Sequence, residues 1–542
     1  MPAVSIASPQ PTTWNEAPRA AITVPWATAR AAVLIGSLLI AAVVRVGALD
    51  TFGFSEDEIN KVQAIAEYRS GHFGANAEHP MLMKLAMWAS VDAAAAWNRI
   101  APDQAIAPET ALRLPNALAG AAITAVLFGV ADLLFGGAVA GAAAILWALD
   151  VNAIAINRIG KEDTFLLLFF LLAVFCYERA KREGTHDLAR AQRWYTLSGA
   201  AFGLMLASKY MPQYLGVYAL FNLLTDRNPG PNRPDRLRHY GAMALTFIAS
   251  NLIVLDPATW HYMSSYVAGD MLAHHGYLYN GALYVTNVPV SPLGVPLTFY
   301  LRLLATKVPL VVLAAAVPGV IEIVRRREER GFVLLRVFAV FVIVPYSLMA
   351  AKFLRYSLPM LATVDLIAAV GIVSGVAWLL RKQWLSIATR RATAAAAVAV
   401  IAVALVRAQH DAAPYYPLFH NALGARLDGR HTAFPEETYD YGVREAVADI
   451  AAVAAPDAVI VSDAPAVVAH YVAAQARTDL QVRSLSGRGI DPRAPESWVI
   501  VQDEHITFEN ASLVSQLRAA ARPWRQIEID DRPAAQIFRI GK

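Results

Sequence analysis

Long apolar blocks alternate with short polar connections along the first four hundred residues of the chain. Most blocks are about 15–25 residues long, which is the length that an α-helix needs to cross the hydrocarbon core of a bilayer. The pattern therefore predicts a mainly α-helical, polytopic membrane protein with about eleven transmembrane helices. The predicted spans are residues 31–49, 111–135, 138–157, 163–180, 194–209, 211–225, 239–255, 296–324, 332–350, 356–380 and 391–407.

The two ends of the chain have a different pattern. Residues 1–30 are rich in Pro, Ala and Thr and predict a disordered cytoplasmic leader. Strand and helix patterns alternate after the last span, which predicts a small soluble α/β domain over residues 409–542. Strand-like runs there are Ala458–Val461, Trp498–Val501, Gln526–Ile529 and Gln536–Ile540, and helical runs include Val443–Ala454, Ala466–Ala474 and Ala511–Ala521. Residues 31–408 then form the transmembrane domain, with outer loops at 50–110 and 257–298.

Basic residues gather in four of the connections between apolar blocks, and the positive-inside rule places such connections in the cytoplasm. All four fall inside if the N-terminus is cytoplasmic and the segment Pro80–Trp97 is an interfacial helix that does not cross. The same count places both long loops and the C-terminal domain on the outer, periplasmic or extracellular, face. The four clusters are Arg179–Arg193, Arg227–Arg238, Arg325–Arg330 and Arg381–Arg391.

Composition agrees with this class and excludes others. The chain is 56% hydrophobic and 17% charged, whereas soluble domains have about 25% charged residues. A net charge of +4, with the bases in short loops, does not indicate a nucleic-acid partner. Cys176 is the single cysteine, which excludes a disulfide framework and a four-cysteine zinc site. Alanine and arginine richness favours a bacterial inner membrane.

Ionisable residues gather near the predicted outer ends of the spans. Each has a structural explanation: acidic runs are often solvated, Asp163 can cap a helix, and lysines reach toward the interface. Together, carboxylates and cations at one membrane face suit a lipid that carries a phosphate. The cations would hold the phosphate, and a carboxylate would take a proton from an incoming hydroxyl or amine. The residues are Asp57, Glu58, Glu78, His79, Lys84, Arg158, Lys161, Asp163, Lys209, Lys307, Lys352 and Arg355.

Several short motifs stand in a fixed order over residues 31–420. They are Asp57-Glu58, His79-Pro80, Arg113-Leu114-Pro115, Asn157 to Asp163, His274-His275-Gly276-Tyr277, Lys307-Val308-Pro309 and Arg355-Tyr356-Ser357-Leu358-Pro359. This order resembles the protein O-mannosyltransferase and aminoarabinose transferase group of the GT-C glycosyltransferases (glycosyltransferase family 39-like). Met81 stands where that family usually has a second proline.

The resemblance implies a GT-C-like bundle that transfers a hexose or pentose from a polyprenyl-phosphate donor. The acceptor, a glycan, lipid or protein, would react at the outer face in an inverting single displacement. Asp57 would be the base, with Glu56 and Glu58 as alternatives, and Glu58 and Asp163 would orient the acceptor or support the base. The donor phosphate would contact Arg355, Lys307, Lys352 and Lys209. Further substrate contacts would come from Glu78, His79, Lys84, Arg158, Lys161, His274, His275 and Tyr356.

Nothing in the sequence requires a cofactor, because no phosphate-binding or dinucleotide-binding glycine loop is present. A divalent metal stays open, with Glu78, His79 and His274 as ligands that could equally bond the sugar. The alternative function is a membrane transporter or lipid flippase with Asp365 in the tenth span as its midplane site. A third interpretation is an envelope assembly protein whose outer domain binds a partner. The rim position of most charges favours the enzyme.

Overall fold

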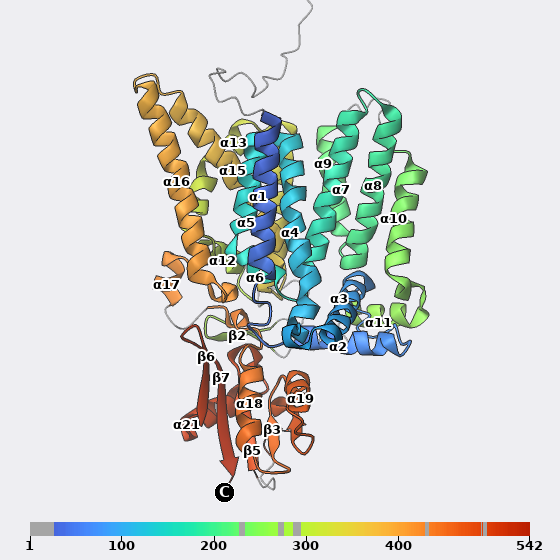
Figure 1. The fold of residues 1–542 in the computed structure, drawn as a ribbon, viewed down its shortest axis with the longest axis vertical. Coiled ribbons are helices and arrows are strands. Elements are labelled where there is room, and N and C mark those ends of the chain that lie inside the picture. Colours follow the sequence, from blue (N-terminus) through green and yellow to red (C-terminus); the bar gives the residue numbers. More distant parts are fainter. Residues whose placement is uncertain are drawn as a thin grey trace, which may run out of the picture.

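A computed structural model describes residues 26–226, 233–268, 276–285, 294–428, 433–488, 490 and 496–541. It shows a bundle of roughly parallel and antiparallel helices with an α/β domain at one end (Figure 1). The bundle helices are α1 (Trp26–Val46), α4 (Pro108–Phe135), α5 (Gly137–Leu149), α6 (Val151–Asn157), α7 (Asp163–Glu183), α8 (Leu188–Ser208), α9 (Gln213–Thr225), α10 (Arg236–Ser250), α12 (Phe299–Lys307), α13 (Leu310–Arg325), α14 (Arg330–Leu348), α15 (Leu358–Leu380) and α16 (Ile387–Ala412).

The protein is a multi-pass membrane protein. Five helices of the described chain are long and apolar enough to cross a membrane, or seven if each of two bent pairs counts as one span. The predicted spans that fall outside this set are α7 to α10, which are helices of the same bundle but are either shorter or less apolar along their length. Every predicted block is therefore helical, whereas the number of eleven crossings stays a prediction.

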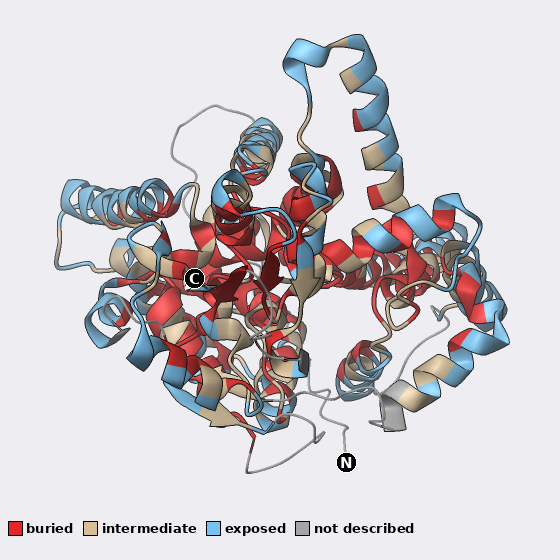
Figure 2. Cartoon of the chain, turned by 90° about the horizontal axis from the view of Figure 1, so that it is seen from below, coloured by how far each residue is buried: buried red, intermediate tan, exposed pale blue. Residues whose placement is uncertain are grey.

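The exposed face of α1 illustrates how the bundle meets lipid. Ile35, Leu39 and Val43 recur every four residues and are 57%, 61% and 70% exposed, so they form one apolar stripe on the outside. Seen from the end that carries the C-terminal domain, buried residues fill the centre and exposed ones lie on the outer helix faces (Figure 2). Residues 1–25 of the predicted leader lie outside the described residues. Helix α1 begins at Trp26, which is earlier than the predicted start of the first span.

Two sharp bends interrupt the bundle near the C-terminal domain. The axes of α5 and α6 differ by 61°, and those of α12 and α13 by 116°. Asp150 ends α5 and caps α6 by accepting hydrogen bonds from the backbone of Asn152 and Ala153, and Pro309 ends α12 because it has no N–H to continue the helix. The Asn152 side chain donates to the carbonyl of Lys307 at 2.8 Å. The two bends therefore lie side by side.

The arginine-rich connections lie at the opposite end of the bundle from the C-terminal domain (Figure 1). Arg330 pairs with Glu178 at 2.7 Å and also with Asp226, which ties together the ends of α7, α9 and α14. The distribution of charge between the two ends is thus the one that the positive-inside rule requires.

Helices of the two long loops lie across the other end of the bundle. These are α2 (Glu56–Arg69), α3 (Met81–Ile100), η1 (Pro102–Gln104), η2 (Leu252–Leu255) and α11 (Pro257–Ala268). The α3 helix contains the segment that was predicted not to cross the membrane. It is not among the helices that are long and apolar enough to do so. The second loop adds the hairpin β1 (Tyr277–Tyr279) and β2 (Ala282–Tyr284), while its residues 269–275 and 286–293 lie outside the described residues.

The C-terminal domain has a five-stranded sheet in the order β4-β3-β5-β7-β6. Strands β3, β4 and β5 are parallel, and β7 is antiparallel to both β5 and β6. All the strands and helices predicted for this domain are present. Strand β4 was not predicted, because it has only three residues and none of them is fully buried. The elements are α18 (Val443–Val453), β3 (Val459–Val461), α19 (Pro465–Ala474), β4 (Gln481–Arg483), α20 (Leu485–Arg488), β5 (Glu496–Val501), η6 (Asp503–His505), α21 (Ala511–Ala520), β6 (Arg525–Ile529) and β7 (Arg532–Gly541).

A connecting segment runs from α16 to α18 and passes between the bundle and the domain. It contains η4 (Tyr416–Leu418), α17 (Ala422–Asp428), η5 (Pro435–Glu437) and the turn before α18. Strand β7 points away from the bundle in Figure 1 and is antiparallel to β5, so the carboxyl ends of β5 and β3 face the connecting segment. This arrangement brings the loops after those strands to the end of the bundle.

The predicted sidedness can be tested with single cysteines in a Cys176→Ala background. Thr185 lies exposed in the α7–α8 turn and Ser512 lies exposed on α21. A membrane-impermeant maleimide should label Ser512→Cys in intact spheroplasts, but Thr185→Cys only after permeabilisation. The background protein, which has no thiol, is the control for labelling. The reverse pattern would show that the topology is inverted.

Candidate active site

The carboxylate of Asp57 is the meeting point of three distant parts of the chain. Ser55 caps α2 through a capping box with Glu58, so Asp57 lies in the first turn of that helix. Its Oδ2 atom lies 2.6 Å from Lys161 Nζ and 3.8 Å from Arg355 Nη2. The hydroxyl of Tyr439 donates to the same oxygen. The site therefore combines the first loop, the turn before α7, the start of α15 and the connecting segment.

The charges around Asp57 fix its ionisation. Burial by itself would raise the pKa of this carboxyl, but Lys161, Arg355 and Lys61 outweigh that effect and hold the pKa well below its usual range. Burial lowers the pKa of the Lys161 amine, opposed chiefly by Asp57. Asp57 is thus an ionised carboxylate at every physiological pH.

Glu58, the neighbour of Asp57, is fully engaged in a buried ion pair. Arg113 at the start of α4 donates to both of its oxygens, at 2.7 and 2.6 Å. The backbone N–H groups of Ser55 and Gly160 also donate to it, at 3.0 and 2.9 Å. The same guanidinium donates to the carbonyls of Leu49, Phe52 and Gly53. This geometry joins the first loop, α4 and the turn before α7. It leaves neither oxygen of Glu58 free to accept a proton from an acceptor substrate.

A second buried carboxylate, Glu162, lies beside Lys161. It is 2.8 Å from Lys61 Nζ, 3.7 Å from His79 Nδ1 and 3.9 Å from Lys161 Nζ. Burial would raise the pKa of Glu162, but His79 and the two lysines keep that pKa far below the ordinary value. Burial also lowers the pKa of His79. Lys161 therefore lies between two carboxylates, Asp57 and Glu162, and Lys61 pairs with Glu162 as well.

Asp163 and Lys209 form a separate pair next to this network. The Lys209 amine lies 2.7 Å from Asp163 Oδ1 and sits 4.6 Å from the ring centre of Tyr356. Arg355, the neighbour of Tyr356 in sequence, stacks on the ring of Phe353 at 4.1 Å. Asp57, Asp163 and Arg355, which the sequence analysis expected in one pocket, thus lie at the same end of the bundle.

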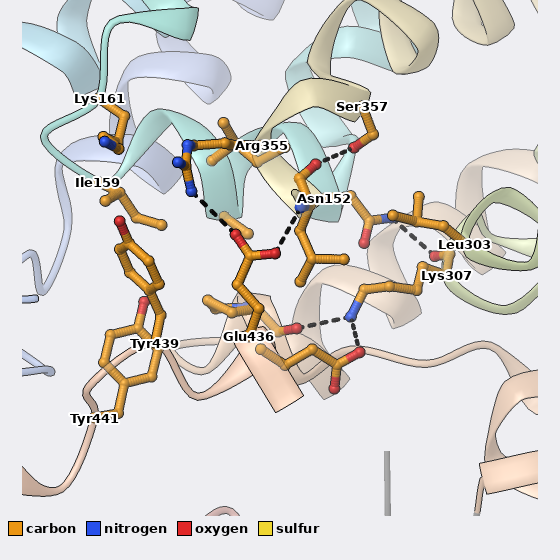
Figure 3. Close-up of a pocket in the computed structure, with 15 residues that line it drawn as sticks. Asn152, Ile159, Lys161, Leu303, Lys307, Arg355, Ser357, Glu436, Tyr439 and Tyr441 are labelled. Carbon is orange, nitrogen blue, oxygen red and sulfur yellow. Dashed lines mark hydrogen bonds and ion pairs between the residues drawn. The ribbon is translucent and has the colours of Figure 1, made fainter. Parts of the chain in front are cut away.

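A cavity opens between the two helix bends and the connecting segment (Figure 3). Together with its mouth it encloses about 600 Å³. Lys161 and Arg355 lie on the bundle side, and Arg355 points at Glu436 across the cavity, with 3.1 Å between Nη1 and Oε1. The lining residues are Asn152, Ala155, Ile156, Ile159, Lys161, Leu303, Lys307, Leu354, Arg355, Ser357, Pro417, Glu436, Glu437, Tyr439 and Tyr441. Three cations thus line the cavity, and two of them pair with Glu436 and Glu437 of the connecting segment.

Lys307 and Lys352, both expected to contact a phosphate, have internal partners. Lys307 lines the cavity, and its amine lies 2.7 Å from Glu437 Oε1 and 2.8 Å from the carbonyl of Pro417. The Lys352 amine donates to the carbonyl of Val295 at 2.6 Å and to that of Met349.

Lys84, Arg158 and Glu78, expected to contact substrate, bind the first loop or the residues around it. Lys84 donates to the carbonyls of Asn76 and His79 at 2.6 and 2.9 Å. Arg158 donates to the carbonyl of Ala48 at 2.6 Å, and Glu78 accepts a hydrogen bond from Asn76. His274 and His275 lie outside the described residues.

Known proteins share this architecture. A family model described as "Dolichyl-phosphate-mannose-protein mannosyltransferase" matches residues 105–254. ArnT from Cupriavidus metallidurans, bound to undecaprenyl phosphate, superimposes with a TM-score of 0.50 and 13% identity over 94% of this chain and 98% of ArnT. Its apo form gives a TM-score of 0.50 and 14% identity over 95% and 98%. This chain has the GT-C fold.

One curated relative agrees with that assignment over a short segment. A stretch of 114 residues is 31% identical to "Putative mannosyltransferase YycA" of Bacillus subtilis (strain 168). The match covers 21% of this chain and 16% of YycA. The family model and this relative agree with the resemblance of the sequence motifs, and the likeness to ArnT shows a shared fold.

Several residues of this site were not singled out from the sequence. Lys61 lies one helical turn after Asp57 on α2, and that spacing is a signal that could have identified it. Glu162 directly precedes Asp163 and was overlooked beside it. Glu436 and Tyr439 lie in an irregular segment far along the chain, and no periodic pattern points to their contacts with Arg355 and Asp57.

The described residues include a group of side chains that could hold a metal ion. Among the described residues, Asp440, Glu504 and His505 form the group whose ligand atoms all lie within 4.8 Å of one another. Glu78 and His79 belong to no such group there. His505 Nε2 lies 2.5 Å from Asp440 Oδ1, so an ion pair already connects two of the three.

Loss of the buried Arg113 guanidinium should strongly destabilise the protein. Arg113→Ala leaves Glu58 as an uncompensated buried charge, which costs about 3–5 kcal/mol. We expect a large fall in the thermal unfolding midpoint of the detergent-solubilised protein. Arg69→Ala removes an exposed pair with Asp92 and should cost about 0–1 kcal/mol. Equal midpoints for the two variants would contradict the role of Arg113.

The ion pair of His505 should make stability depend on pH. Burial by itself would lower the pKa of His505, but Asp440 and Glu504 outweigh it and raise that pKa to about 10. The folded pKa exceeds the unfolded one, so the stabilisation is complete below about pH 6.5 and is lost as the pH rises toward 10. Unfolding midpoints of the parent should fall over this range more steeply than those of His505→Gln. The exposed His410→Gln variant should follow the parent.

Proposed function

We propose that the protein transfers a hexose or pentose from a polyprenyl-phosphate donor to an acceptor at the outer face of a bacterial cytoplasmic membrane. One observation carries the proposal. The carboxylate of Asp57 pairs with Lys161 and Arg355, and these two cations line a cavity located where the apolar bundle ends. A base and a phosphate-binding pair at the membrane boundary are what such a transfer needs.

The cavity suits the head of a lipid donor. Lys161 and Arg355 face it, whereas Ala155, Ile156 and Leu303 give it apolar walls. A polyprenyl tail would remain in the bilayer beside the helices, while the phosphate replaces the internal partners of the two cations. ArnT, which shares the fold over nearly its whole length, has been captured with undecaprenyl phosphate.

The transfer is a single displacement. The acceptor oxygen or nitrogen attacks the anomeric carbon, the bond between that carbon and the phosphate oxygen breaks, and Asp57 takes the acceptor proton. The phosphate leaves as an anion that Arg355 and Lys161 stabilise, so no separate acid is needed. Configuration at the anomeric carbon is inverted.

Donor binding should also activate the base. In the free protein, Lys161 and Arg355 are the charges that depress the pKa of Asp57 most. A bound phosphate would draw both cations toward itself and add negative charge nearby, and each effect raises the pKa of Asp57. The carboxylate would thus become a stronger base when the donor is in place.

Removal of the proposed base provides the direct test. Asp57→Asn should lower kcat by about a hundredfold or more, with little change in the KM for the donor. The measurement is release of polyprenyl phosphate from radiolabelled polyprenyl-phosphate sugars by purified protein. Asp92→Asn, an exposed residue on α3, is the matched control. Full activity of Asp57→Asn would refute the assignment, and uptake of uncleaved donor into vesicles would favour a transporter.

A further inference from the structure

The closest contact of each of three Asp57 partners is with the same oxygen atom. Lys161, Arg355 and the Tyr439 hydroxyl approach Oδ2. Oδ1 accepts no hydrogen bond from any residue in the described part of the chain. An oxygen that already accepts from several donors is a poor acceptor for another proton. The carboxylate is therefore held by one oxygen and presents the other.

Tyr439 reaches this position through an unusual turn. The backbone is left-handed at Tyr439, with φ of 37°, and at Asp440, with φ of 64°, and Gly442 follows at 90°. Left-handed conformations are uncommon for residues other than glycine, and they persist where surrounding contacts fix them. We call residues 438–442 the Tyr439 turn.

Contacts on both sides hold the Tyr439 turn. Asp440 Oδ2 accepts from the backbone N–H of Glu56 at 2.7 Å, which attaches the turn to the first residue of α2. On the other side, Asp440 Oδ1 lies 2.5 Å from His505 Nε2, and the backbone N–H of Asp440 donates to Glu504 at 2.8 Å. The Thr438 hydroxyl also donates to Glu504, at 2.7 Å. The loop after β5 thus fixes the turn against α2.

We propose that Tyr439 is a positioning residue for the transfer: it holds Asp57 Oδ2, so that Oδ1 takes the proton of the acceptor. This inference rests on the proposed function and deepens it. The phenol keeps its own proton throughout, and the acceptor proton moves to Oδ1. It also assigns a task to the C-terminal domain, which fixes the turn that carries Tyr439.

The test compares full-length Tyr439→Phe with the parent protein. The change removes the hydroxyl and keeps the ring. We expect kcat to fall roughly tenfold, the usual effect of losing a hydrogen bond to a charged group, with the donor KM within about twofold. The acid limb of the kcat profile should move to higher pH, because the carboxylate loses a donor. A purely structural role would not produce this split or this shift. Tyr240→Phe, at an exposed site on α10, is the matched control.

A second measurement does not require turnover. A water-soluble carbodiimide modifies protonated carboxyls, so Asp57 should be labelled faster in Tyr439→Phe than in the parent at the same acidic pH, as measured by peptide mass spectrometry. His505→Gln loosens Asp440 without touching the cavity and should change kcat and labelling in the same direction by less. The His505→Gln variant tests the proposal if Tyr439→Phe does not fold.

The outcomes separate the two proposals. If the parent releases polyprenyl phosphate but Tyr439→Phe has unchanged kcat, pH profile and labelling, the role of Tyr439 is overturned and the proposed function stands. If the parent cleaves no donor but labelling of Asp57 still responds to Tyr439→Phe, the proposed function fails and the hold on Oδ2 is supported. If the parent cleaves no donor and labelling of Asp57 does not respond to Tyr439→Phe, both proposals are wrong.

Discussion

The buried ion pair between Glu58 and Arg113 is the contact on which the rest of the site depends. Arg113 lies in the second turn of α4, Glu58 lies in the first turn of α2, and Gly160 on the turn before α7 donates to the same carboxylate. Removing either charge would leave the other buried without a partner. Since Asp57 and Lys161 are immediate neighbours of Glu58 and Gly160, the pair determines where both of them lie.

Charge balance governs the surroundings of this pair. Lys161 lies between Asp57 and Glu162, Arg355 between Asp57 and Glu436, and Lys307 faces Glu437. Buried charges are expensive unless they are paired, so the folded protein supplies an anion for each of these cations. A phosphate entering the cavity would replace such anions rather than fill an unpaired site, and the carboxylates that it frees are then available for proton transfer.

The C-terminal domain belongs to this arrangement. Its sheet directs the carboxyl ends of β3 and β5 toward the bundle, and the loop after β5 carries Glu504 and His505 to the Tyr439 turn. Glu436 and Glu437, which precede that turn, contact Arg355 and Lys307. A segment that links two domains thus provides one wall of the cavity, which ties the arrangement of the site to the docking of the domain.

The sequence by itself determined the helical bundle, the strands of the small domain and the end of the bundle at which the chemistry gathers. Apolar blocks must become helices in a bilayer because every backbone polar group needs an internal partner there, and the arginine clusters distinguish the two ends. Motif order also selected Asp57, Lys161 and Arg355 as neighbours of one site. These features follow from the local pattern of apolar and charged residues and from the bilayer that surrounds the helices.

Only the tertiary structure decided which charges pair. Glu58 looked equivalent to Asp57, yet Arg113 occupies both of its oxygens. Lys307 looked equivalent to Arg355, yet Glu437 holds it. Tyr439 reaches Asp57 across more than three hundred residues of chain. Pairing depends on distances of a few ångströms between segments remote in sequence, and no local periodicity encodes such distances.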